Sequence, residues 1–212
     1  MKVIPTDPYR PRTIIPRRSG QCFQFDSSGK RPSSFQGHTY SHVLVDLHCR
    51  KRYSFYTSDL SAESMVAGFR GILLNNPSWI ESNWTSKPLQ RFVQVDPHHT
   101  NVSADVAAYL QGSDCRYEIR PTPVEDHHGN GVVENTIGKQ ASIINAYLFD
   151  GPRRLPTAFW ALANRHADHM AMFCYHRRLK SSPYMFDGGP QIDCRYIQPF
   201  GIGCWAKHSR GS

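Results

Sequence analysis

Two acidic residues, Asp26 and Asp96, stand at the ends of short segments that have the pattern of β-strands. Residues 21–26 alternate polar and apolar side chains, and residues 91–96 are a second short segment of strand type that ends in an acid. If the two strands are parallel neighbours, their carboxyl ends meet at one edge of the sheet. The sequence therefore predicts two carboxylates close together at that edge.

A third acid, Glu134, follows a turn at Gly129-Asn130-Gly131, where glycine and asparagine tolerate positive φ. Apolar residues then recur at helical spacing, at Val133, Ile137, Ile144 and Leu148. Glu134 is thus expected in the first turn of a helix, where its carboxylate can face a cleft. The ordinary alternative is that an acid in a first turn only favours the helix dipole.

Three carboxylates at one point repel each other strongly unless a cation lies between them. Hard oxygen ligands of this kind suit Mg²⁺ or Mn²⁺ rather than zinc. Two such ions can activate a water or a hydroxyl and stabilise the leaving oxygen in phosphoryl transfer. In a basic protein, this chemistry indicates the phosphodiesters of nucleic acids as the substrate.

The composition fits one domain with an appendage, since the chain has 212 residues and 39% of them are hydrophobic. The formal net charge is +8, which favours a polyanionic partner, nucleic acid first. No apolar run approaches the length of a membrane span, so no membrane partner is expected. The 6 cysteines are scattered without a C-x-x-C pair, which argues against a structural zinc site and a disulfide framework and favours a reduced intracellular chain.

The order of the predicted elements indicates an α/β fold with a five-stranded mixed sheet and helices on both faces. Strands are expected at 21–26, 42–47, 53–56, 91–96 and 116–120, and helices at 59–74, at 103–110, from the turn before Glu134 to about 150, and from about 156. Residues 1–20 are predicted to form a basic, proline-rich linker, residues 21–180 the core, and residues 181–212 a C-terminal extension packed on or following the core.

Several motifs resemble the catalytic core of retroelement integrases, in particular the branch of copia-type retrotransposons. They are Phe25-Asp26, Val95-Asp96, Gly129-Asn130-Gly131-Val132-Val133-Glu134, which is similar to the family's Q-N-G-V-x-E, Leu155-Pro156-x-x-Phe159-Trp160, Ser182-Pro183-Tyr184 and Pro199-Phe200-Gly201. The resemblance covers about residues 21–208. It implies a ribonuclease-H-like fold in which Asp26, Asp96 and Glu134 are the catalytic, metal-binding triad.

An integrase core of this family binds DNA ends, cleaves a phosphodiester with metal-activated water and joins the new 3′ hydroxyl to target DNA. The resemblance implies Mg²⁺ or Mn²⁺ as cofactor, a homo-oligomer, and action in the nucleus, reached through cytoplasmic virus-like particles. The chain departs from the family pattern at Pro97-His98, where Asn-Gly is usual, at Gly129, where Gln is usual, and at Asn135, where Arg is common. These departures leave a second interpretation open, in which the chain is a non-catalytic DNA-binding or assembly module that retains the integrase fold.

Further residues are expected to contact DNA: Arg17, Arg18, Asn130, Lys139, His127 and His128. Asp46 is a rival for the role of Asp26, although a strand antiparallel to the first would carry Asp46 to the opposite end. The histidines at 98, 99, 127 and 128 offer a third reading, a zinc-binding module, but no further soft ligand stands at a fixed spacing from them.

Overall fold

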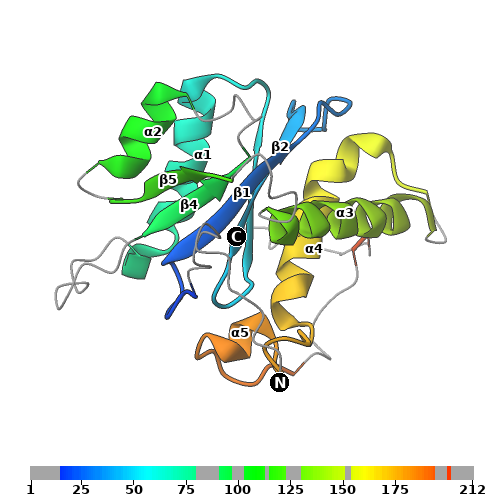
Figure 1. The fold of residues 1–212 in the computed structure, drawn as a ribbon. Coiled ribbons are helices and arrows are strands. Elements are labelled where there is room, and N and C mark those ends of the chain that lie inside the picture. The colour runs from blue at the N-terminus through cyan, green and yellow to red at the C-terminus, as the bar shows by residue number, and fades with distance from the viewer. Residues whose placement is uncertain are drawn as a thin grey trace, which may run out of the picture.

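The computed structural model describes residues 15–79, 91–96, 103–112, 115–122, 130–150, 154–193 and 200–201. A five-stranded mixed sheet runs through the molecule, with strands in the order β3-β2-β1-β4-β5 and helices on both faces (Figure 1). The strands are β1 (Cys22–Ser28), β2 (Tyr40–Asp46), β3 (Arg52–Thr57), β4 (Phe92–Val95) and β5 (Glu118–Pro121). The predicted fold class is confirmed.

The first three strands form an antiparallel meander, and the last two lie parallel to β1. Because β4 and β5 each follow a helical crossover, the chain returns to the same end of the sheet before each of them. β5 begins two residues later than the sequence pattern predicts. Arg116 has a φ of 53°, a left-handed conformation that cannot continue into an extended strand.

One face of the sheet is covered by α1 (Ala62–Leu74) and α2 (Ala104–Gln111). Both helices begin where a serine caps them, since the side chains of Ser61 and Ser103 accept hydrogen bonds from backbone N–H groups of the first turn. The helix predicted from residue 59 starts at 62 because Asp59 instead accepts hydrogen bonds from Ser61. The core beneath these helices is aromatic, with Phe25 stacked on Phe55 and packed against Phe69.

The other face carries α3 (Gly131–Asn145) and α4 (Trp160–Phe173) (Figure 1). The described elements also include four short helical segments: the 3₁₀ helices η1 (Pro77–Trp79) and η3 (Thr157–Phe159), the π-helical segment η2 (Ala146–Asp150), which continues α3, and the helix α5 (Pro183–Phe186). Val133 of α3 is fully buried and packs on Val43 and Val45 of β2. Within the described residues, no helix combines the length and the apolar character needed to cross a membrane.

Residues just outside the predicted core of 21–180 contact that core on both sides. The N–H of Gly20 donates a 2.7 Å hydrogen bond to Oδ2 of Asp46, and the Tyr117 hydroxyl donates to the Gly20 carbonyl at 2.7 Å. On the C-terminal side, Asp187 forms an ion pair with Lys51 at 2.5 Å, and α5 packs against α4. The chain from 15 to 20 and the chain around α5 are therefore held on the core.

A buried carboxylate, Asp168, lies between α3 and α4 and accepts a hydrogen bond from the side-chain amide of Gln140. Burial raises the pKa of Asp168 to about 6, although Arg52 and hydrogen bonds from Ser54 and Gln140 oppose that rise. The folded state therefore holds a proton that the unfolded chain releases at lower pH, so this contribution to stability is present below pH 4 and is lost as the pH rises through 6.

We expect Asp168→Asn to remove that pH dependence and to stabilise the protein at pH above 7 by about 2–3 kcal/mol, since each pKa unit corresponds to roughly 1.4 kcal/mol. Urea unfolding of both proteins between acid and neutral pH measures the effect. Glu63→Gln, which changes an exposed carboxylate of α1, is the control. Parallel stability curves for wild type and Asp168→Asn across this range would contradict the expectation.

Candidate active site

Asp26 and Asp96 lie side by side in the backbone of the sheet. β1 and β4 are parallel, and Phe25 is the register partner of Val95, so the next residue of each strand is one of the two acids. Both acids are half-exposed, and Oδ1 of Asp26 accepts a 2.7 Å hydrogen bond from the N–H of Ser27. The expectation that both acids reach the carboxyl edge of parallel neighbouring strands agrees with this geometry.

Glu134 is brought to the same edge because the start of α3 is tied to β1. The side-chain oxygen of Gln24 accepts hydrogen bonds from the N–H groups of Val132 and Val133, at 3.1 and 3.2 Å. Two of the four N–H groups that a helix leaves unpaired at its start are satisfied in this way by a residue of the sheet. Glu134 follows directly, in the first turn of α3, with an exposed side chain.

Asn130, predicted to contact DNA, is a second tie between α3 and β1. It is 3% exposed, and its Nδ2 donates to the carbonyl of Phe25 at 3.3 Å, one residue before Asp26. Its Oδ1 is buried and has no hydrogen-bond partner among the described residues. A buried amide oxygen of this kind, beside a strand end that carries a carboxylate, fits a site that binds a hard cation or its water.

The three acids thus share one edge of the sheet through their backbone positions. Among the described residues, no three His, Cys, Asp or Glu side chains gather closely enough to hold a metal ion. The donor set nevertheless fits Mg²⁺ or Mn²⁺, because it consists of carboxylate and amide oxygens.

Asp46 has a different role, because it is fully buried at the other end of the sheet. It is the antiparallel register partner of Phe23, three residues before Asp26. Its carboxylate accepts N–H groups from Gly20, His48 and Cys49 at 2.7, 2.7 and 3.2 Å. Burial raises its pKa, and these hydrogen bonds limit the rise. Asp46 therefore organises the turn after β2 and does not approach the three acids.

The other residues predicted to contact DNA are dispersed. Arg17 is exposed and Arg18 is half-buried, and both precede β1, at the end of the sheet opposite Asp26. Burial and, to a lesser extent, Arg91 lower the pKa of Arg18. Lys139 is exposed on α3, beyond Glu134. His127 and His128 lie outside the described residues, as do His98 and His99.

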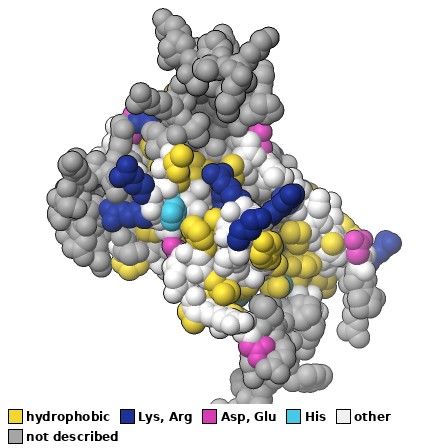
Figure 2. All heavy atoms as spheres, turned by 60° about the horizontal axis from the view of Figure 1, so that its bottom comes forward, with side chains coloured by type: hydrophobic (Ala, Val, Ile, Leu, Met, Phe, Trp, Pro, Cys, Tyr) yellow, Lys and Arg dark blue, Asp and Glu magenta, His cyan; other side chains and the backbone are white. Residues whose placement is uncertain are grey.

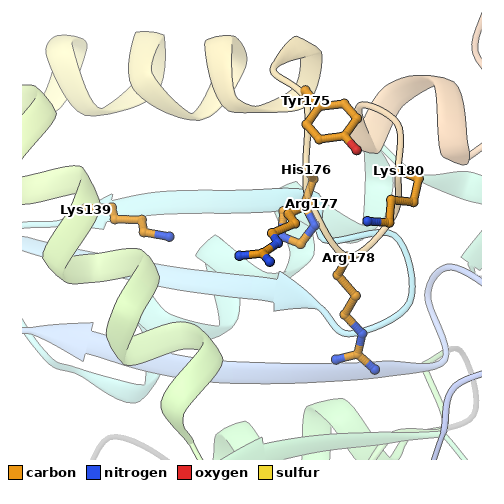
Figure 3. Close-up of a pocket in the computed structure, with 6 residues that line it drawn as sticks. All are labelled: Lys139, Tyr175, His176, Arg177, Arg178 and Lys180. Carbon is orange, nitrogen blue, oxygen red and sulfur yellow. The ribbon is translucent and has the colours of Figure 1, made fainter.

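Two features of the site were missed by sequence reasoning. The first is Gln24, whose signal was its place in β1, two residues before Asp26 and hence on the same face of the strand. The second is a set of basic residues between α3 and the turn that follows α4, where Arg177, Arg178 and Lys180 come together with Lys139 (Figure 3). Its signal was the density of basic residues between 176 and 180.

No protein-family model and no curated protein matches this sequence. Solved structures do. The chain is similar to the HTLV-2 integrase catalytic core domain in complex with magnesium, in its trimeric form, with 16% identity and a TM-score of 0.56 over 81% of this chain and 98% of that one. The dimeric form of the same domain gives 17% identity and a TM-score of 0.50, over 74% of this chain and 88% of that one.

A further match is the cryo-electron-microscopy structure of the simian T-cell lymphotropic virus intasome in complex with the PP2A regulatory subunit B56 gamma. Here the identity is 13% and the TM-score 0.60, over 95% of this chain and 64% of that one. At identities this low, the structural similarity establishes the fold and leaves the chemistry open. The chain has the ribonuclease-H-like fold of retroviral integrase catalytic cores.

Proposed function

We propose that this protein is the catalytic core of an integrase, of the copia-type retrotransposon branch, which binds DNA, cleaves near a 3′ end and transfers that end to target DNA. One observation carries the proposal. Asp26 and Asp96 follow register partners on adjacent parallel strands, and α3 is fixed beside them so that Glu134 stands in its first turn.

Asp26, Asp96 and Glu134 would hold Mg²⁺ or Mn²⁺, which when bound supplies an activated nucleophile and stabilises the leaving oxygen. The residues of this chain determine where the three carboxylates lie. Gln24 and Asn130 fix the first turn of α3 on β1, so the carboxylate of Glu134 stays at the edge where the two aspartates emerge. The net charge of +8 draws the DNA backbone to the protein.

The proposal includes assembly and location. The magnesium-bound cores similar in fold were solved in trimeric and dimeric forms, and the other match belongs to an intasome. By this likeness, and by the resemblance of the sequence motifs, we propose that the chain acts as a homo-oligomer on retroelement ends and target DNA. Its place of action would be the nucleus, reached through cytoplasmic virus-like particles.

A second function is favoured by one residue. Pro97 follows Asp96 directly, where the family usually has Asn-Gly. Proline fixes φ and lacks an N–H, so the chain after Asp96 has fewer conformations and one donor less than the family pattern provides. A chain constrained in this way would bind DNA and assemble with other copies without performing the chemistry.

Metal-dependent thermal stability tests the proposed site. Mg²⁺ or Mn²⁺ at about 100 times its dissociation constant stabilises a folded protein by about 2.7 kcal/mol, which for a chain of this size raises the melting temperature by about 5–10 °C. We expect this rise in the wild type and none in Asp96→Asn, as measured by differential scanning fluorimetry.

Glu63→Gln, which removes an exposed acid on the opposite face of the sheet, should retain the full rise. A wild type whose melting temperature ignores both ions would reject the metal site. A rise of equal size in Asp96→Asn would show that the stabilising ion is bound by residues other than Asp96.

A further inference from the structure

A pocket of about 700 Å³ opens between α3 and the turn that follows α4. Figure 3 shows Lys139 extending from α3 toward that turn, whose side chains supply the rest of the wall. The lining residues are Lys139, Tyr175, His176, Arg177, Arg178 and Lys180. Four of the six are permanent cations at neutral pH, and none is acidic.

The turn holds its basic side chains in a fixed frame. The N–H of His176 donates to the Ser181 carbonyl at 2.8 Å, and the N–H of Leu179 donates to the His176 carbonyl at 3.1 Å. Lys180 adopts a φ of 54°, which reverses the chain direction within a few residues. The side chains between these two hydrogen bonds are therefore displayed from one closed loop rather than from a free segment.

No carboxylate of the described residues pairs with these cations. The ion pairs that the described part of the chain forms elsewhere include Lys51 with Asp187 and Arg120 with Glu118. Further positive charge lies close by at Arg50 and Arg52. Burial is the largest cause that lowers the pKa of His176, and these two residues lower it as well, together with Lys139 and Arg178 of the pocket. Figure 2, which turns the lower end of Figure 1 toward the reader, shows Lys and Arg side chains gathered on this face.

Three buried nitrogen atoms in this region lack hydrogen-bond partners among the described residues. They are Nε of Arg50, Nη1 of Arg52 and Nδ1 of His176. A buried donor that remains unpaired costs about 1–3 kcal/mol, and more when it is charged. The unpaired guanidinium N–H groups of Arg50 and Arg52 lie beside lysine and arginine side chains that pair with no carboxylate of the described residues, and this arrangement suits an anion with several acceptor oxygens.

We propose that this pocket binds the phosphate backbone of DNA and guides the strand along α3 away from the three acids. The identity of the polymer rests on the proposed function. Lys139 follows Glu134 by five residues, about 7.5 Å along the helix axis, so the pocket begins on the same helix that carries Glu134. A polyanion fits better than a small anion, since the cations come from two separate elements and surround an open pocket.

Fluorescence anisotropy with a labelled DNA duplex tests the site in EDTA, where the acids have no metal and contribute no attraction. The test variant is Arg177→Gln/Arg178→Gln, which leaves the strained backbone at Lys180 unchanged. The control is Arg70→Gln/Arg154→Gln, which removes the same charge from exposed positions outside the pocket.

We expect the test variant to bind DNA at least about tenfold more weakly than wild type, with a salt slope lower by about two, since each phosphate contact contributes about 0.9 to that slope. The control should stay within about twofold of wild type, because it loses only long-range attraction. Titration with sodium triphosphate identifies the source of the anion, and for a DNA site it should compete only at millimolar concentrations.

Equal affinity of the test and control variants would overturn the proposal, as would tight triphosphate binding that leaves DNA binding intact. Metal-induced stabilisation is measured on the same variants and separates the two proposals. If the test variant loses DNA binding and keeps the metal-induced rise in melting temperature, both proposals stand. If the test variant loses DNA binding and the melting temperature of wild type does not rise with metal, the proposed DNA-binding pocket is supported and the proposed metal site is rejected.

Discussion

Asp96→Asn is expected to reduce DNA strand transfer by at least about 1,000-fold, equivalent to roughly 4 kcal/mol of transition-state stabilisation. The amide is almost the same size as the carboxylate, so the fold is preserved while the negative charge of the proposed metal ligand after β4 is lost. The measurement is joining of a pre-cut, labelled DNA end to a target duplex in Mg²⁺ or Mn²⁺. Asp26→Asn and Glu134→Gln should give losses of similar size, since the three acids act as one unit.

Glu63→Gln is the matched control and should join DNA at the wild-type rate, because it lies on the face covered by α1. DNA binding of Asp96→Asn in EDTA should equal that of wild type. A variant that loses an acid and keeps most of its joining activity would reject the catalytic assignment. A wild type that binds metal and DNA and joins nothing would favour the non-catalytic module.

Gln24→Leu is expected to destabilise the protein by about 1–3 kcal/mol and to impair joining further than that loss explains. Leucine fills a similar volume but cannot accept the two N–H groups at the start of α3. The first turn then frays from β1, and Glu134 loses its fixed position beside the aspartates. Urea unfolding measures the first effect, and DNA joining well below the unfolding transition measures the second.

Gln24→Glu keeps the acceptor oxygens, and a carboxylate at a helix start favours the helix dipole. It also loses the Nε2 donor to Oε1 of Gln94 and buries a charge, so this variant should recover only part of the stability that Gln24→Leu loses. A leucine variant as stable and as active as wild type would show that the hydrogen bonds from Val132 and Val133 do not position α3.

The sequence was informative where a local pattern decides the structure. Alternation before Asp26 and a short segment rich in apolar residues before Asp96 predicted two strands, and Ser103 before an apolar repeat predicted the start of a helix that the structure confirms. The parallel crossovers also followed from local facts, since a helix between two strands favours a crossover. The adjacency of β1 and β4 was only a condition of the predicted site, and the structure meets it. These predictions depend on residues that are close together in the chain.

What the sequence could not show depends on contacts between distant residues. Gln24 and Val132 are separated by 108 positions, so no local pattern indicates that a glutamine of the sheet caps α3. Likewise, the sequence around Lys139 and around Arg178 predicts only an exposed basic side chain at each position. The packing of α4 against α3 is what brings the two residues into a common pocket. Side-chain positions at the three acids also lie beyond sequence reasoning, because they depend on what the carboxylates bind.

The short segment before β1 bears on where the folding unit begins. Gly20 adopts a φ of 76° with its Cα so close to the Trp79 ring that an added Cβ would lie 2.4 Å from a ring atom. His48 contacts the Pro16 carbonyl at 3.1 Å, and Asp46 receives one of its N–H groups from Gly20. A chain that begins at the first residue of β1 would expose the indole of Trp79. It would also remove one of the N–H groups that the buried carboxylate of Asp46 accepts. Truncation for expression should therefore stop before Pro16.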